Sequence, residues 1–203
     1  RAPACPLSLS SPSLPPDTHA RQALVIGAGL SGSAVAHSLA SRGWTVTVID
    51  QANGVGAGAS GLPAGLAAPH VSPDDNVLSR ITRAGVQATL QRAEALLQSG
   101  TDWALTGVLE HNLAGKRRLP TGDCAQGTAL DGSTQASAEQ IAAAGLPSET
   151  PALWHARAGW IRPRQLVAAQ LRTPGVQVRW GLQAHTLARR GELWTVTDAQ
   201  GQT

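Results

Sequence analysis

A six-residue glycine motif constrains the fold of this chain more than any other feature. Gly27-Ala28-Gly29-Leu30-Ser31-Gly32 has the spacing G-x-G-x-x-G. It follows QALVIG (22–27), a short apolar run typical of a buried parallel strand. It leads into LSGSAVAHSLASRG, which has helical apolar spacing and ends at Gly43. WTVTVID (44–50) is rich in β-branched residues and predicts a second strand. These segments predict a βαβ unit with parallel strands, whose helix turns Val35, Ala36, Leu39 and Ala40 toward the core.

The position of this motif predicts a dinucleotide site. Gly27 permits a tight turn, Gly29 lets the backbone approach a pyrophosphate, and Gly32 lets the helix pack near the strand. The amides from Ala28 to Gly32, at the positive end of the helix dipole, are expected to receive the phosphates. Asp50 ends the second strand, where a carboxylate accepts hydrogen bonds from ribose hydroxyls and repels a 2′-phosphate. The alternative is a glycine-rich turn that binds nothing.

Composition excludes several other classes of protein. Of the 203 residues, 42% are hydrophobic and 14% charged, as in a globular protein, and no apolar run approaches the roughly 18–20 residues of a membrane span. The net charge of +3 is compatible with a polyanionic partner but is far from that of a dedicated nucleic-acid module. Cys5 and Cys124 stand far apart without a CxxC pair, which predicts no metal site and a reduced, cytoplasmic setting.

The remaining chain predicts a mixed α and β organisation. A helix is expected to open at Ser72, with a core stripe at Val86, Leu90, Ala93 and Leu97. Further elements are predicted from a strand at 106–113, a capping box from Ser137 to Gln140, a helix near Pro163, and strands in VQVRW and ELWTVTDAQGQ.

Taken in order, these patterns divide the chain into four parts. We expect a Pro/Ser-rich linker at 1–21, a dinucleotide-binding βαβ unit and glycine loop at 22–75, a partial substrate domain at 76–157, and a return to the dinucleotide-binding domain at 158–203. The predicted fold class is therefore α/β, a Rossmann-like FAD/NAD(P)-binding domain with a parallel sheet, plus part of an α+β substrate domain.

A second glycine segment carries a resemblance to a known family. GASGLPAGLAAP (58–69), followed by PDDNVLSR, resembles the FAD-binding start of the D-amino-acid oxidase superfamily, which has G-A-S-G-N-x-x-G-x-x-x-P here. Leu62 stands where the family usually has Asn. The resemblance returns at AGWIRPRQL, and at GLQAHTL, where it places Ala184 on a strand that holds the adenine ring. The motif and the resemblance together imply an FAD site made of Gly27, Ala28, Gly29, Leu30, Ser31, Gly32, Asp50, Gln51, Ala59, Ser60, Gly61, Gly65, Leu66 and Ala184.

Within that superfamily the chain is most similar to the oxidoreductase half of bifunctional bacterial proteins that modify tRNA. This resemblance implies oxidation of a C–N bond in 5-carboxymethylaminomethyl(-2-thio)uridine at the wobble position. Hydride passes to flavin N5, the imine is hydrolysed and glyoxylate leaves. It also implies tRNA as the substrate and a methyltransferase domain upstream. Family members continue further, so the C-terminal part of the fold is expected to be absent and this segment alone to leave the flavin site incomplete. No catalytic residue is identified.

Three alternatives stay open at this point. The chain could belong to an FAD-dependent D-amino acid or glycine oxidase or dehydrogenase, to an NAD-dependent dehydrogenase, or to an inactive truncated dinucleotide-binding module. His70 could face the flavin or be a plain loop histidine. The basic residues at 116–118, and Arg157, Arg162 and Arg164, could contact tRNA phosphates or substrate, or simply be solvated.

Overall fold

The computed structural model describes residues 21–111, 119–120, 132–191, 193–199 and 201. Residues 1–20 of the predicted 1–21 linker, Cys124 and the basic run at 116–118 lie outside the described residues.

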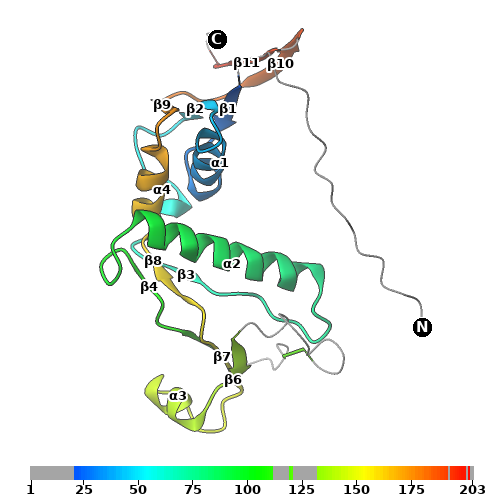
Figure 1. Ribbon diagram of the computed structural model, residues 1–203, viewed down its shortest axis with the longest axis vertical. Helices are drawn as coiled ribbons and strands as arrows, with labels where there is room; N and C mark the ends of the chain where they lie inside the picture. The colour runs from blue at the N-terminus through cyan, green and yellow to red at the C-terminus, as the bar shows by residue number, and fades with distance from the viewer. Residues whose placement is uncertain (1–20, 112–118, 121–131, 192, 200, 202–203) are drawn as a thin grey trace, which may run out of the picture.

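A parallel sheet contains the predicted βαβ unit. Strands β1 (Gln22–Ile26), β2 (Thr45–Asp50) and β9 (Val176–Trp180) lie in the order β1-β2-β9, and both pairs are parallel. Helix α1 (Leu30–Ala40) connects the first two strands. Figure 1 shows this sheet and α1 together at one end of the molecule. The βαβ prediction is confirmed.

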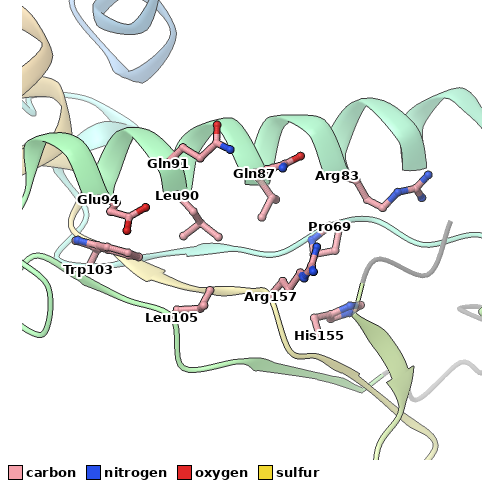
Figure 2. Close-up of a pocket in the computed structure, with 11 residues that line it drawn as sticks. Pro69, Arg83, Gln87, Leu90, Gln91, Glu94, Trp103, Leu105, His155 and Arg157 are labelled. Atoms are coloured by element: carbon pink, nitrogen blue, oxygen red, sulfur yellow. The ribbon is translucent and has the colours of Figure 1, made fainter. Parts of the chain in front are cut away.

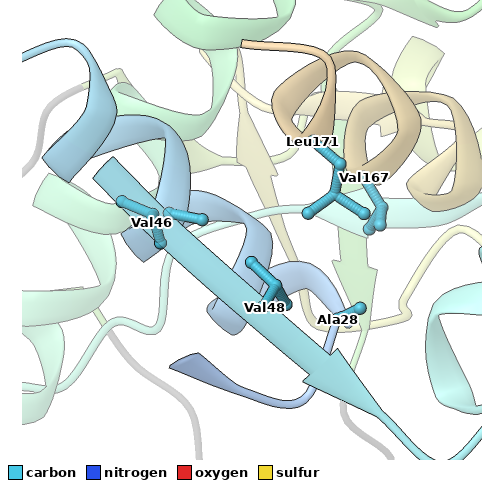
Figure 3. Packing of buried hydrophobic residues seen from close by; sticks show 6 residues of the cluster. Ala28, Val46, Val48, Val167 and Leu171 are labelled. Carbon is cyan, nitrogen blue, oxygen red and sulfur yellow. The ribbon is translucent and has the colours of Figure 1, made fainter. Parts of the chain in front are cut away.

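The core of this unit lies between the sheet and two helices. Val46 and Val48 of β2 pack with Ala36 of α1 and with Val167 and Leu171 of α4 (Pro163–Leu171), as Figure 3 shows for the strand and α4 side chains. The side chains on this face of β2 alternate with those on the other face, as expected for a pleated strand. Since Pro163 is the first residue of α4, it begins the helix without losing a hydrogen bond.

The predicted face of α1 packs on the core except at one residue: Ala36 is buried and Leu39 and Ala40 pack against the same cluster. Val35 is 49% exposed, whereas Ser33 is fully buried and its hydroxyl donates to Gln170 Oε1 at 2.6 Å. Burial of these two polar side chains is tolerated because each satisfies the other. The prediction that Val35 faces the core was therefore wrong. A pattern that counts only apolar residues cannot find a buried polar pair such as Ser33 and Gln170.

A long helix crosses the middle of the molecule (Figure 1). This helix, α2, spans Val77–Leu96 and begins five residues later than predicted. Its N-cap is Asn76, whose side chain accepts from the Ser79 amide at 3.0 Å. Ser72 instead lies before the helix, where its hydroxyl bonds the Ser79 hydroxyl at 2.9 Å. Within the predicted stripe, Ala93 is fully buried.

The other strands form small antiparallel sheets. Strands β3 (Gly65–Ala67), β8 (Gly159–Ile161) and β4 (Trp103–Ala104) form one sheet in the order β3-β8-β4. A second sheet has the order β5-β7-β6, from β5 (Val108–His111), β7 (Ala152–His155) and β6 (Ser133–Gln135). Strands β10 (Thr186–Arg190) and β11 (Leu193–Thr197) pair as a hairpin.

Two further elements complete the description. Helix α3 (Ala138–Ala143) begins with the predicted capping box, in which Ser137 and Gln140 bond each other's backbone. A single 3-10 turn, η1, covers Ala59–Gly61. None of the helices that the structure describes is long and apolar enough to cross a membrane.

Candidate dinucleotide site

The first glycine motif forms the turn from β1 into α1. Gly27 has φ +98°, a left-handed conformation that favours glycine, and its amide donates to the Ile49 carbonyl at 2.8 Å. A Cβ atom at Gly32 would overlap the Gly27 carbonyl oxygen. The first turn of α1 therefore packs directly on the loop, and both glycines are required by the backbone geometry.

Asp50 reaches back from the end of β2 to this turn. Its Oδ2 accepts from the Ala28 amide at 2.6 Å, and its Oδ1 accepts from the Ala52 amide at 2.8 Å. The carboxylate thereby joins the glycine turn to the loop that follows β2. Each carboxylate oxygen has a second lone pair, so Asp50 can still accept a hydrogen bond from a ribose hydroxyl.

The second glycine segment meets the first at the start of α1. Ser60 in η1 accepts from the Leu30 amide at 3.1 Å. A Cβ at Gly29 would lie 3.2 Å from the Ser60 hydroxyl oxygen, which is tighter than ordinary contact. The predicted cluster of amides is therefore partly used within the protein, since those of Ala28 and Leu30 already have partners.

Two adjoining cavities lie on this framework, each of about 250 Å³. The first is lined largely by backbone and by small residues, as a diphosphate requires for close approach. The second is bounded by apolar side chains and by the chain after β9, which suits an aromatic base. Asp50 and Gln51 line both cavities and so lie where the two meet.

Most of the sequence-predicted residues gather around these cavities. Ala28, Gly29, Ala59 and Ser60 line the first, and Gly27 and Ala184 line the second. The others, which line neither cavity, are Leu30, Ser31, Gly32, Gly61, Gly65 and Leu66. Ala184 lies in the connection between β9 and β10, so its predicted placement on a strand was wrong.

Sequence reasoning missed several lining residues. They are Ala52, Gly54 and Gly56–Gly58 in the first cavity, and Ile26, Ile49, Leu182 and Gln183 in the second. The density of glycines after β2 was the available signal for the first group. The second group has no local signal, because it combines the ends of three strands.

A separate groove of about 330 Å³ lies between α2 and the strands below it, and Figure 2 shows Trp103 and His155 at its opposite ends. Arg83, which is 7% exposed, bonds Asp75 Oδ1 at 2.6 Å, and this hydrogen bond lowers the pKa of Asp75. The groove shares no lining residue with the dinucleotide cavities. Arg157 lines it.

The other predicted arginines lie elsewhere. The side chain of Arg164 packs on Gly56, so closely that a Cβ atom added at Gly56 would lie 2.9 Å from the Arg164 Cγ. Arg162 is the N-cap of α4. Over the part of the chain that the structure describes, no three His, Cys, Asp or Glu side chains are placed to hold a metal ion.

Fold and site define a dinucleotide-binding α/β protein with the glycine turn at the carboxyl ends of a parallel sheet. The sequence matches the DAO family, described as FAD dependent oxidoreductase, over residues 22–203, and the chain belongs to this family. Its cofactor class is therefore FAD, which removes the NAD-dependent alternative. The backbone-lined cavity fits such a group, because small residues let a diphosphate approach closely, and a Cβ at Gly29 would press on Ser60, which lines the same cavity.

Relatives with similar sequences carry one common name. The chain is 53% identical over 182 residues to the tRNA 5-methylaminomethyl-2-thiouridine biosynthesis bifunctional protein MnmC of Polaromonas naphthalenivorans, covering 88% of this chain and 29% of that protein. The protein of the same name from Paracidovorax citrulli is 59% identical over 157 residues, covering 75% and 24%. The chain thus spans less than a third of the length of these relatives.

Solved structures share the fold at low sequence identity. Glycine oxidase from Bacillus cereus is 22% identical with a TM-score of 0.66, covering 90% of this chain and 54% of that one. L-α-glycerophosphate oxidase from Mycoplasma pneumoniae, with FAD bound, is 17% identical with a TM-score of 0.66, covering 88% and 50%. These likenesses support the fold and no substrate.

Proposed function

We propose that this oxidoreductase oxidises a C–N bond of an amine, and that its substrate is the 5-carboxymethylaminomethyl(-2-thio)uridine at the wobble position of tRNA. The observation that carries the proposal is the 53% identity, over 88% of this chain, to a protein named for biosynthesis of a tRNA uridine. A reduced, cytoplasmic setting and a methyltransferase domain in the same protein belong to the proposal.

The same proposal assigns roles to the residues of the site. The diphosphate lies against the turn from Gly27 to Gly32 and is held by amides other than those of Gly27, Ala28 and Leu30, which bond within the protein; Asp50 holds the ribose, and the cavity beside Ala184 holds the adenine. The chain then continues through Gly61 and Gly65 to Leu66, which we assign to the flavin side. When bound, FAD supplies a two-electron acceptor, and the protein supplies orientation and exclusion of water.

The test uses tRNA that carries the carboxymethylaminomethyl group. The FAD-loaded protein is incubated with this tRNA, and the nucleosides are digested and measured by mass spectrometry. We expect loss of the carboxymethyl group from the nucleoside and release of one glyoxylate for each nucleoside converted. Heat-denatured protein and tRNA without the modification are the controls.

An assay with free amino acids distinguishes the proposed tRNA-modifying enzyme from a glycine or D-amino acid oxidase. A glycine or D-amino acid oxidase would turn these over without tRNA, whereas the proposed enzyme leaves them unchanged and loses activity steeply as salt rises. Turnover of glycine together with an unaltered nucleoside would contradict the proposal.

A further inference from the structure

The diphosphate cavity and its proposed occupant carry charge of the same sign. Among the described residues that line this cavity, Asp50 is the one charged side chain, and it is negative. The diphosphate of FAD is a dianion, so the carboxylate and the diphosphate repel each other. Two nearby amides, those of Ala28 and Leu30, already have partners within the protein and do not offset this repulsion. A cation placed behind one wall of the cavity would offset it.

Arg164 packs against one of these walls. The wall is the loop 51–58 after β2, and Gly56 lies within it. A Cβ added at Gly56 would lie 2.9 Å from the Arg164 Cγ and 3.1 Å from its Cδ, so the aliphatic stem of Arg164 runs along the loop. Gly56 lines the cavity and Arg164 does not, which places Arg164 behind the loop. The guanidinium is bonded to Cδ, so its positive charge lies close to the loop.

The loop itself is held in place by neighbouring elements. Val55 packs against the core cluster that includes Val167 of α4. A Cβ at Gly61 would overlap the Gly56 carbonyl oxygen, so η1 packs directly on this peptide group. Gly56 has φ +77°, a conformation in which a larger residue would be strained. The stem of Arg164 is therefore one part of a packed support for the wall of the cavity.

The place of Arg164 in α4 is unfavourable for a cation. Arg164 is the second residue of this helix and Arg162 is its N-cap, and the first turn contains no acidic residue. The positive end of the helix dipole repels both arginines. In the part of the chain that the structure describes, the Arg164 side chain forms no ion pair or hydrogen bond. Natural sequences depart from such local rules mainly at functional sites, and an anion bound near Arg164 would balance its charge.

We infer that Arg164 is a positioning residue of the dinucleotide site. Its stem supports the loop 51–58, and its charge stabilises the bound diphosphate from behind that loop. The inference rests on the placement of the diphosphate in this cavity, which belongs to the proposed function. Because Arg164 is exposed, solvent screens its charge, and we expect the charge to change the affinity for a diphosphate by about fivefold.

Calorimetric titration of the 203-residue chain, freed of flavin, with two small probes tests the charge. ADP carries the adenine, ribose and diphosphate of FAD, and adenosine lacks the diphosphate. We expect the wild-type protein to bind ADP more tightly than adenosine. Arg164→Met keeps an aliphatic stem and removes the charge, so the affinity for ADP should fall about fivefold while the affinity for adenosine stays the same. A variant that had merely lost its structure would bind both probes more weakly.

Three comparisons separate the effect of this charge from a general one. Arg172→Met is the matched control, because Arg172 is an exposed arginine at the other end of α4, and it should keep the wild-type affinity for ADP. Arg164→Lys retains the charge and should restore most of the affinity. Raising NaCl from about 0.1 to about 1 M shortens the Debye length from about 10 to about 3 Å and should remove most of the difference between wild type and Arg164→Met.

A further variant tests the stem. Arg164→Ala removes both stem and charge, and hydrogen–deuterium exchange over residues 51–58 of the flavin-free protein should be faster in it than in Arg164→Met. Equal exchange in the two variants would overturn the supporting role of the stem. Undiminished affinity for ADP in Arg164→Met, an equal loss in Arg172→Met, or no recovery in Arg164→Lys would overturn the role of the charge.

Failure of the proposed function gives a different pattern. Binding of the probes is measured by heat and needs no turnover, so an effect of Arg164→Met on ADP alone, together with unaltered tRNA, would support the inference and contradict the proposed substrate. Conversion of the tRNA nucleoside, with ADP bound equally by wild type and Arg164→Met, would support the function and overturn the inference. A wild-type protein that binds ADP no more tightly than adenosine would refute the placement of the diphosphate, and the inference with it.

Discussion

Replacing Asp50 by Asn is the sharpest test of the dinucleotide site. In the wild-type protein the two carboxylate oxygens accept from the amides of Ala28 and Ala52 at 2.6 and 2.8 Å. Asparagine keeps one acceptor and turns its NH₂ group toward the other amide, so one of these hydrogen bonds is lost. A hydrogen bond to a charged group contributes about 1.5–3 kcal/mol. We expect a loss of about 2 kcal/mol, which lowers the melting temperature by about 4–8 °C in a chain of this size.

Binding of FAD should weaken in the same variant. The charge that we propose receives the ribose hydroxyl is gone, so the dissociation constant should rise about 10- to 100-fold. Thermal unfolding without cofactor and titration with FAD, followed by quenching of flavin fluorescence, measure the two effects. Asp102→Asn is the matched control, because Asp102 accepts from the Gln98 amide at 3.2 Å on an exposed turn. If Asp50→Asn melts and binds FAD like the Asp102 control, the reasoning about the site is refuted.

Three further predictions concern stability. Gly32→Ala should abolish the compact fold or the FAD site, because its Cβ would overlap a backbone carbonyl, and a circular dichroism melt with the wild-type midpoint would contradict this. Burial, with a smaller effect from Arg92, lowers the pKa of His37 below 6.5, so the unfolded chain binds a proton at a higher pH than the folded protein does. The free energy of unfolding should therefore fall as pH drops below about 6.5, and it should fall less in His37→Asn. Melting temperatures of both proteins at pH 7.5 and 5.5 measure this difference. Asp75→Asn should lower the free energy of unfolding by about 1.5–3 kcal/mol at pH 7, because it removes the charged partner of buried Arg83. In urea unfolding, this difference between variant and wild type should disappear as pH falls well below 3.8, where the wild-type carboxyl is also protonated. An equal difference at all pH values would refute the prediction.

The βαβ unit could be predicted because its signals are local. The glycine spacing, the helix after it and the β-branched run up to Asp50 lie within about 30 residues, and each element carries its own pattern. The capping box at Ser137 is local in the same sense. These elements formed as predicted because local preference and tertiary packing agree there.

Other features depend on partners that are distant in sequence. Ser33 is buried against Gln170, 137 residues away, and no local pattern announces such a pair. The sequence offers two signals for the N-terminus of α2, and the prediction used the wrong one. Ser72 followed by Pro73 indicated a start at Ser72, but the side chain that caps the helix is that of Asn76. The apolar cavity beside Ala184 combines the ends of β1 and β2 with the connection after β9, so its lining follows from the sheet order. The division of the chain into four parts stays a prediction.

Strand β3, which leads away from the dinucleotide cavities, is three residues long, and its pairing partner β8 comes much later in the sequence. Among the strands that the structure describes, β3 pairs with β8 alone, and Gly65 lies opposite Ile161, so their contact closes a loop of about 95 residues. During synthesis, the first turn and its two flanking strands can assemble long before that contact is possible. We therefore expect β1, α1 and β2 to acquire order first, and the region around Leu66 to remain unformed until residue 161 has left the ribosome.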